Sequence, residues 1–372
     1  MVTSHRRSSG EHPLRIAVAG LDRYGQRGGI ARVVRALTAE WEQTEKVVSA
    51  SFKALPVPLL KNLPLQVQLP PQSSLIFVPQ LTGASCLAGR SKLPGVVLVH
   101  DVGVIDFADD RKDLGAVGTF LVRQHFHALR FADRIVVCSE FTRDRIVTRL
   151  PALRERIHVI PNGVSSVFLE SEIDRAASRS ALGAMVPDLK ASHVLLYVGT
   201  ETKRKNVAQL LRVLRLVKSV IPDVQLLKVG SAGTAEHRGR TLRTMGELGL
   251  EPETDVVFLD SISDELLMHS YAAADAYVST SLYEGFGLPL LEALAMGAPV
   301  ITLESGPMRE LLGKHGDVVA NSDEAIADSV LRALKTTPSP EAVSARRQHA
   351  RQFTWKRSAD QYLHLFQGMG RA

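Results

Sequence analysis

The sequence has little cysteine, few aromatic residues and no long apolar run, and each shortage excludes a class of protein. Two cysteines, Cys86 and Cys138, in 372 residues cannot build a disulfide framework. No stretch reaches the roughly 18 uninterrupted apolar residues of a spanning helix, because Asp101, Asp106 and Glu292 interrupt the best candidates. We therefore expect a globular protein of a reducing compartment, the cytoplasm.

Signatures of several function classes are missing as well. No spacing of His and Cys fits zinc, and there is no serine nucleophile elbow. Lysines and arginines are scattered, aromatic residues make up only 5% of the chain, and nothing resembles a nucleic-acid-binding motif. The net charge of +6 therefore suits another anionic partner, either a phosphorylated substrate or a membrane surface. We expect no nucleic acid, no metal and no other cofactor.

What is present is an alternation of short apolar, β-branched runs with helical segments, which is typical of parallel strands joined by crossover helices. The first half predicts strands over residues 14–20, 47–53, 75–80, 96–101, 134–139 and 157–161. The second half predicts strands over 194–199, 224–230, 256–259, 276–279 and 299–303, with helices over 206–220, 263–273, 288–296, 323–335, 341–353 and 355–366. The predicted fold class is α/β, with two doubly wound, Rossmann-like parallel sheets.

The length of the chain and a polar stretch near its middle predict two domains. We expect a flexible tail over 1–13, an N-terminal domain over 14–168, a linker with a short helix over 169–190, a C-terminal domain over 191–352 and a helical end over 353–372. Doubly wound sheets bind ligands beyond the C-terminal ends of their strands. Two such sheets that face each other predict a site in the cleft between the domains.

The most informative stretch is YEGFGLPLLE, residues 283–292, between an expected strand and an expected helix. Gly285 and Gly287 let the backbone approach a ligand closely, and the unpaired amides of the helix start attract a diphosphate. Glu284 and Glu292 would flank it, and carboxylates accept paired hydrogen bonds from vicinal diols such as those of a hexose and a ribose. Taken one at a time, these residues also fit a tightly packed turn and solvent-facing glutamates.

The whole run resembles the E-x7-E motif of the retaining glycosyltransferases of family 4, whose GT-B fold places two Rossmann-like domains on either side of a cleft. The resemblance implies that Glu284 contacts the hydroxyls of the donor hexose and that Glu292 binds the ribose. It also implies that the residues after Glu284 line the donor: Gly285, Phe286, Gly287 and Leu288.

A second stretch, TETKRKN over 200–206, follows an expected strand and is strongly basic. Cations there would stabilise the charge that develops on a leaving diphosphate without a metal ion. A merely solvated basic helix start is the less natural explanation, since cations are disfavoured near a helix N-terminus. The stretch resembles the family's R-K-N phosphate clamp, which implies that role for Arg204 and Lys205. Thr200 stands where many members carry arginine, and we expect it to line the donor.

Further parts of the chain resemble the family outside these two motifs. The pair Gly28-Gly29 resembles the glycine loop opposite the donor, and His100 resembles the histidine near the donor sugar, where it would assist catalysis. Ile262 corresponds to the region that contacts the base. In the family the segment equivalent to 353–372 crosses back to the N-terminal domain.

The resemblance implies metal-independent, retaining transfer of a hexose from a nucleotide diphosphate sugar to a glycan or lipid-linked acceptor. GDP-mannose is favoured as donor because members with a similar Gly-Phe-Gly-Leu-Pro run often use it, and a UDP-hexose comes next. Two alternatives are open: a nucleotide-sugar epimerase or phosphorylase of GT-B architecture, and a non-catalytic transferase-like subunit. A cluster of arginines adds the hypothesis of peripheral binding to the anionic inner face of the membrane: Arg23, Arg27, Arg32 and Arg35.

Overall fold

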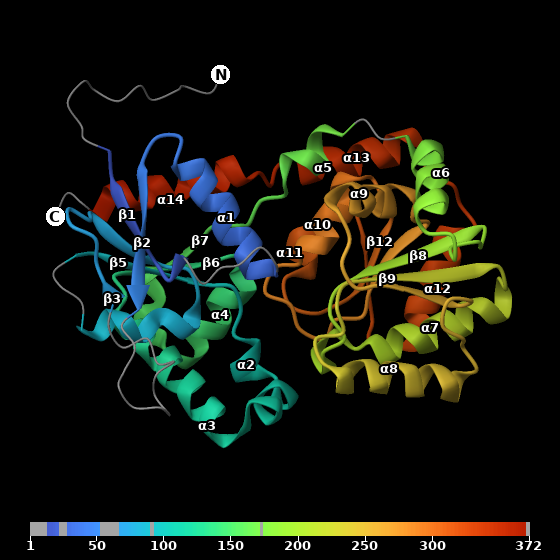
Figure 1. Cartoon of the computed structure of the whole chain (residues 1–372), viewed down its shortest axis with the longest axis horizontal. Coiled ribbons are helices and arrows are strands. Elements are labelled where there is room, and N and C mark those ends of the chain that lie inside the picture. Colours follow the sequence, from blue (N-terminus) through green and yellow to red (C-terminus); the bar gives the residue numbers. More distant parts are fainter. Residues whose placement is uncertain (1–12, 22–27, 53–66, 90–92, 172–173, 370–372) are drawn as a thin grey trace.

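The computed structural model describes residues 13–21, 28–52, 67–89, 93–171 and 174–369. Within these residues the chain forms a seven-stranded sheet in the order β3-β2-β1-β4-β5-β6-β7 and a six-stranded sheet in the order β10-β9-β8-β11-β12-β13. Neighbouring strands are parallel, except that β3 runs antiparallel to β2. Figure 1 shows the sheets in two lobes side by side, with helices on both faces of each. The predicted α/β class with two doubly wound sheets is confirmed.

The strands and helices of the first lobe follow one another along residues 15–159. Its strands are β1 (Arg15–Ala19), β2 (Lys46–Phe52), β3 (Val67–Gln68), β4 (Leu75–Val78), β5 (Gly95–Val99), β6 (Arg134–Val137) and β7 (Ile157–Val159). Its helices are α1 (Gly29–Trp41), α2 (Gly103–Asp106), α3 (Ala108–His127) and α4 (Glu140–Arg149), with 3-10 turns η2 (Leu81–Gly89), η3 (Ala128–Phe131) and η4 (Pro151–Arg156).

The second lobe repeats this alternation. Its strands are β8 (His193–Val198), β9 (Val224–Val229), β10 (Val256–Leu259), β11 (Ala276–Ser279), β12 (Val300–Leu303) and β13 (Asp317–Val319). The helical segments are α5 (Ser166–Glu170), α6 (Arg175–Met185), η5 (Lys203–Lys205), α7 (Val207–Val220), α8 (Ala235–Leu248), α9 (Asp264–Ala273), α10 (Leu288–Ala295), α11 (Met308–Leu312), α12 (Asp323–Leu334) and α13 (Pro340–Ala350).

Central strands of both sheets are apolar along their whole length because helices cover both of their faces. All five residues of β5 and all four of β4 and β12 are buried. The apolar side chains of each sheet divide into two clusters, one on each face. In the part of the chain that the structure describes, no helix combines the length and hydropathy needed to cross a bilayer.

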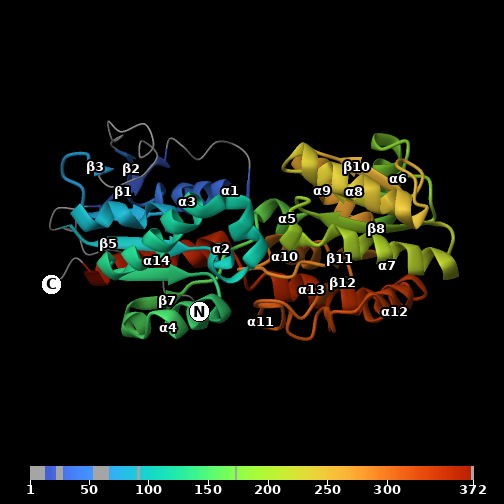
Figure 2. The same cartoon turned by 90° about the horizontal axis from the view of Figure 1, so that it is seen from below.

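The last helix, α14 (Trp355–Met369), returns to the first lobe and packs beside α1 (Figure 1). Its apolar face meets an aromatic cluster: the ring centroid of Trp41 lies 5.6 Å from that of Tyr362 and 5.4 Å from that of Phe366. Figure 2 shows the same return from below. The chain thus passes from the first lobe to the second and back again. Because α14 follows the second lobe in sequence and packs on the first, its packing helps to hold the two lobes together.

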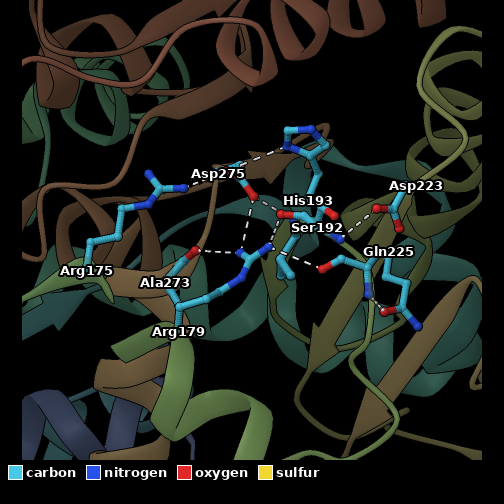
Figure 3. A network of polar contacts seen from close by, with 10 residues as sticks. Arg175, Arg179, Ser192, His193, Asp223, Gln225, Ala273 and Asp275 are labelled. Atoms are coloured by element: carbon cyan, nitrogen blue, oxygen red, sulfur yellow. Dashed lines mark hydrogen bonds and ion pairs between the residues drawn. The ribbon is translucent and has the colours of Figure 1, made fainter. Parts of the chain in front are cut away.

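The stretch expected to be a linker contains α6, and polar contacts hold this helix to the second sheet (Figure 3). Arg175 and Arg179 lie 2.5 and 3.3 Å from the carboxylate of Asp275, the residue before β11. Arg179 also donates to the carbonyl of Ala273 at 3.0 Å, and Leu182 is fully buried in the core. The helix therefore packs as part of the second lobe, while the exact domain limits stay a prediction.

Candidate active site

The two stretches singled out in the sequence meet where the strand order of the second sheet reverses, between β8 and β11. At such a reversal the connections leave on opposite faces, so a crevice forms beyond the strand ends. The loops after the two strands are bonded to each other: the amide of Leu282 donates to the carbonyl of Arg204 at 2.8 Å, and the hydroxyl of Thr280 donates to the carbonyl of Asn206 at 3.0 Å. The basic turn is therefore held directly against the loop that carries Glu284.

Glu284 and Lys205 form the ion pair at the centre of this arrangement. Lys205 Nζ lies 2.5 Å from Glu284 Oε1, and Arg204 Nη1 lies 3.8 Å from Glu284 Oε2. The Lys205 and Glu284 side chains are 14 and 12% exposed. Burial alone would raise the pKa of Glu284, but the two cations outweigh it and hold that pKa below its ordinary value. The carboxylate is thus charged at neutral pH and ready to accept hydrogen bonds.

Glu292 lies in the second turn of α10 and is more deeply buried, with 4% of its side chain exposed. Its Oε2 accepts a 2.8 Å hydrogen bond from the hydroxyl of Tyr271, and its Oε1 is bonded to Arg32 of α1 in the first lobe. Burial raises the pKa of Glu292, while Arg32 and Tyr271 oppose that rise. Neither glutamate of the motif faces bulk solvent, which excludes the solvent-facing explanation for both.

The glycine loop between the glutamates lies against the first lobe. A Cβ on Gly285 would lie 2.0 Å from the carbonyl oxygen of His100, so only glycine fits there. The hydroxyl of Ser139 donates to the carbonyl of Gly285 at 2.8 Å. Gly287 adopts φ +101° and precedes α10, where it accepts from the amide of Leu290 at 3.0 Å. The loops at the carboxyl ends of both sheets are therefore in direct contact, and we call this contact region the interlobe seam.

Phe286 and Leu288 differ in what they offer a ligand. The ring of Phe286 is buried in the core of the second lobe, 6.2 Å from the ring of Phe353, so only its backbone can contribute to a site. Leu288 is half-buried at the first position of α10, where its amide has no carbonyl one turn back in the helix. Ile262 and Thr200 are half-buried, and the carbonyl of Thr200 accepts from the hydroxyl of Tyr197 at 3.0 Å.

His100 reaches the seam from the end of β5. Its Nε2 lies 2.9 Å from the carbonyl oxygen of Pro79, which can only accept, so Nε2 carries the proton and Nδ1 is left as an acceptor. Burial lowers the pKa of His100, which keeps the ring neutral. Gly28 and Gly29 are exposed, and a Cβ at either would meet no atom within 4 Å. Of the arginine cluster, Arg23 and Arg27 lie outside the described residues.

A buried polar network next to the basic turn η5 was missed by the sequence analysis. Lys228 of β9 is 1% exposed and lies 2.9 Å from Glu201, which also pairs with Arg238 at 2.8 Å. Burial lowers the pKa of Lys228, whereas Arg238 and Lys228 overcome burial and lower the pKa of Glu201. The available signal was a lysine inside the apolar strand run 224–229. This network fixes the start of the loop that carries Arg204 and Lys205.

Two further residues of the seam carried no separate signal in the sequence. Tyr271 comes from α9 and Arg32 from α1, and both reach Glu292 only in the folded chain. Arg32 entered the sequence analysis only as one of four clustered arginines, and the structure adds its bond to Glu292 in the seam. Among the described residues no group of three or more His, Cys, Asp or Glu side chains is arranged to hold a metal ion.

Two family models match the chain in succession. The model for Glycosyltransferase Family 4 matches residues 72–167, and the model for Glycosyl transferases group 1 matches residues 188–350. The chain belongs to the GT-B glycosyltransferases of the family 4 type. The basic stretch 200–206 and the stretch 283–292 with its two glutamates both lie inside the second match.

Curated relatives align over about two thirds of the length of this chain. The O-antigen chain mannosyltransferase B of Escherichia coli is 28% identical over 250 residues, which cover 66% of this chain and 64% of the relative. The D-inositol 3-phosphate glycosyltransferase of Mycolicibacterium smegmatis is 33% identical over 239 residues, covering 62 and 52%. The chain thus spans only between half and two thirds of these relatives' length.

Solved structures match this chain over nearly its whole length. The sucrose-phosphate synthase of Thermosynechococcus elongatus superposes with a TM-score of 0.75 at 22% identity, covering 96% of this chain and 99% of that one. The Anabaena protein HepE in complex with UDP-glucose gives 0.75 at 19% identity, covering 95 and 100%. At these identities the likeness shows that the fold is GT-B.

Proposed function

We propose that the protein transfers a hexose from a nucleotide diphosphate sugar to a hydroxyl of a glycan or lipid-linked acceptor, with retention at the anomeric carbon and without a metal. The observation that carries this proposal is the Lys205–Glu284 ion pair at 2.5 Å beside the start of α10, with Glu292 buried one turn further on. A diphosphate between the cations and the helix start would leave a sugar on the side of Glu284 and a ribose on the side of Glu292.

The roles follow from the charges. Arg204 and Lys205 stabilise the negative charge that the diphosphate gains as the bond from the anomeric carbon to its oxygen breaks. The buried charged carboxylate of Glu284 accepts from two hexose hydroxyls, and Glu292 accepts from the ribose diol. The acceptor oxygen then bonds to the anomeric carbon on the face that the diphosphate leaves, and its proton passes to a diphosphate oxygen. No side chain acts as a covalent nucleophile in this scheme.

The first lobe supplies the other side of the reaction. His100, with Nε2 bonded to Pro79, offers Nδ1 as an acceptor for a sugar hydroxyl. The exposed glycines Gly28 and Gly29 leave open space at the start of α1. Backbone atoms of Gly287 and Leu288 contact the diphosphate in the proposed complex, Thr200 lines the donor, and Ile262 lies where the base would bind.

The donor favoured in this proposal is GDP-mannose, followed by a UDP-hexose. Support for mannose as the sugar comes from two curated relatives that are named mannosyltransferases, the Escherichia coli protein and the MMP α-(1→4)-mannosyltransferase of Mycolicibacterium hassiacum, which is 27% identical over 255 residues. The acceptor class follows from the resemblance to the family, and the Escherichia coli relative is named for an O-antigen chain. Binding to an anionic inner membrane surface is proposed as a separate property, and sedimentation with anionic liposomes at low salt tests it.

The proposal is tested by a donor screen followed by product analysis. UDP, GDP, ADP and the nucleotide sugars derived from them are compared by thermal shift, since a ligand at 100 times its Kd stabilises a protein by about 2.7 kcal/mol. The donor that binds is incubated with candidate acceptors, and the anomeric configuration of the product is read by NMR. An acceptor-dependent product with the donor's configuration supports the proposal. Conversion without an acceptor, or only with phosphate, indicates the epimerase or the phosphorylase instead.

A further inference from the structure

Arg32 connects the two lobes at the carboxylate to which the proposed function assigns the ribose. It lies in the first turn of α1, and its Nη1 is bonded to Oε1 of Glu292 across the seam. Tyr271 occupies the other carboxylate oxygen, Oε2, at 2.8 Å. Both oxygens of Glu292 therefore already have partners within the protein.

This arrangement sets up a competition. A ribose diol donates two hydrogen bonds and needs carboxylate lone pairs that point out of the protein. The Glu292 side chain is 4% exposed in the second turn of α10 and is also held by the buried hydroxyl of Tyr271, whereas the Arg32 side chain is 40% exposed. When a nucleotide binds, Arg32 is therefore the partner that moves and Glu292 is the one that stays.

The diphosphate is the anion that the guanidinium of Arg32 can bind once it leaves Glu292. It lies at the start of α10 in the proposed complex, one turn before Glu292. The other two cations of the site, Lys205 and Arg204, share their charge with Glu284 at 2.5 and 3.8 Å. A diphosphate carries more negative charge than this partly neutralised pair balances, and the planar fork of an arginine matches phosphate oxygens.

We infer that Arg32 is a donor-positioning residue that exchanges Glu292 for the diphosphate when the nucleotide binds. The inference rests on the proposed function. It assigns Arg32 two alternating partners: Glu292 in the ligand-free protein and the diphosphate in the complex. The first lobe thereby contributes a cation to a donor site whose other groups come from the second lobe.

The experiment compares a nucleoside diphosphate with its nucleoside, because only the diphosphate offers Arg32 its second partner. Isothermal titration uses whichever of UDP, GDP and ADP binds the wild type, together with the corresponding uridine, guanosine or adenosine. Arg32→Met is expected to weaken diphosphate binding at least fivefold and to leave nucleoside binding unchanged or tighter, since Glu292 loses its competitor. Arg35→Met, which removes an exposed charge one turn along α1, is the matched control and should change neither.

Three outcomes overturn the inference. Tighter binding of both ligands by Arg32→Met would show that Arg32 only competes with the ribose for Glu292. Equal weakening of both would make it a general support of the seam, and unchanged binding of both would remove it from the site. The variant Arg32→Met/Glu292→Gln, which leaves no unpaired buried carboxylate, should fold even if Arg32→Met alone does not, and must still bind the diphosphate less tightly than Glu292→Gln does. If the wild type binds none of UDP, GDP and ADP, the proposed function fails as well.

Discussion

Replacing Lys205 by methionine is the sharpest test of the clamp. The substitution keeps most of the apolar stem but removes the ammonium group that lies 2.5 Å from Glu284 and faces the expected diphosphate. Turnover should fall because the leaving group loses a fixed charge-assisted contact that is strongest in the transition state.

The size of the effect follows from the contact that is lost. A hydrogen bond to a charged group contributes about 1.5–3 kcal/mol, which corresponds to roughly 10- to 150-fold in rate. The side chains of Lys205 and Glu284 are 14 and 12% exposed, so solvent screens this contact little. Arg204, at 3.8 Å, keeps Glu284 charged in the variant and limits the loss.

The assay is release of the nucleotide from the donor with acceptor present, followed in single turnover so that product release does not mask the chemistry. Lys205→Arg should recover part of the rate, and Lys335→Met, which removes an exposed charge at the end of α12, should keep all of it. A folded Lys205→Met protein with the wild-type rate constant would refute the assignment of the clamp.

Three further predictions concern the seam and its support. The pKa of Glu284 in the folded protein lies below its ordinary value of 4.5, so its ion pair stabilises the fold above that value and stops doing so as the pH falls through the lowered pKa. In thermal melts between about pH 5 and 2, Glu284→Gln should therefore lose less stability than the wild type. Parallel curves of stability against pH for the two proteins would argue against this. Gly285→Ala places a methyl group 2.0 Å from the His100 carbonyl oxygen and should push apart the loops that carry these two residues. Turnover should therefore fall at least about tenfold, because the reacting groups are displaced. An unchanged rate would show that the close approach of these loops does not matter for turnover. Lys228→Met removes one of the two cations that pair with the buried Glu201 and should cost about 1.5–3 kcal/mol in urea unfolding, because Arg238 stays as its other partner. Lys228→Met/Glu201→Gln should cost less, and a double variant as unstable as the single one would contradict this.

The elements of the fold were largely predictable because buried parallel strands have a distinctive composition. The runs 256–259 and 276–279 were predicted with the bounds that β10 and β11 have, and most other strands differ by a few residues at their ends. The short strand β13 was missed because Asp317 begins it and only three residues pair. The helix α8 was missed because its exposed, basic sequence carries few apolar residues.

The residues of the candidate site that could be predicted are those in loops that follow a predicted strand. Glu284 and Lys205 lie in the loops that follow β11 and β8, which are neighbours in the sheet, so the strand order brings these loops together. The partners of Glu292 could not be predicted this way, since Arg32 and Tyr271 lie 260 and 21 positions away in sequence. Neither a stripe of apolar residues nor a turn signal marks such contacts. They depend on how the two lobes meet, which no local pattern encodes.

The most direct test of the central claim is a structure of the protein with a bound nucleoside diphosphate. The account predicts that the diphosphate lies between Lys205 Nζ and the amide of Leu288, that the ribose hydroxyls lie on the carboxylate of Glu292, and that Arg32 has turned to the phosphates. A nucleotide bound elsewhere, or one at this position whose phosphates contact neither Lys205 nor the start of α10, would contradict it.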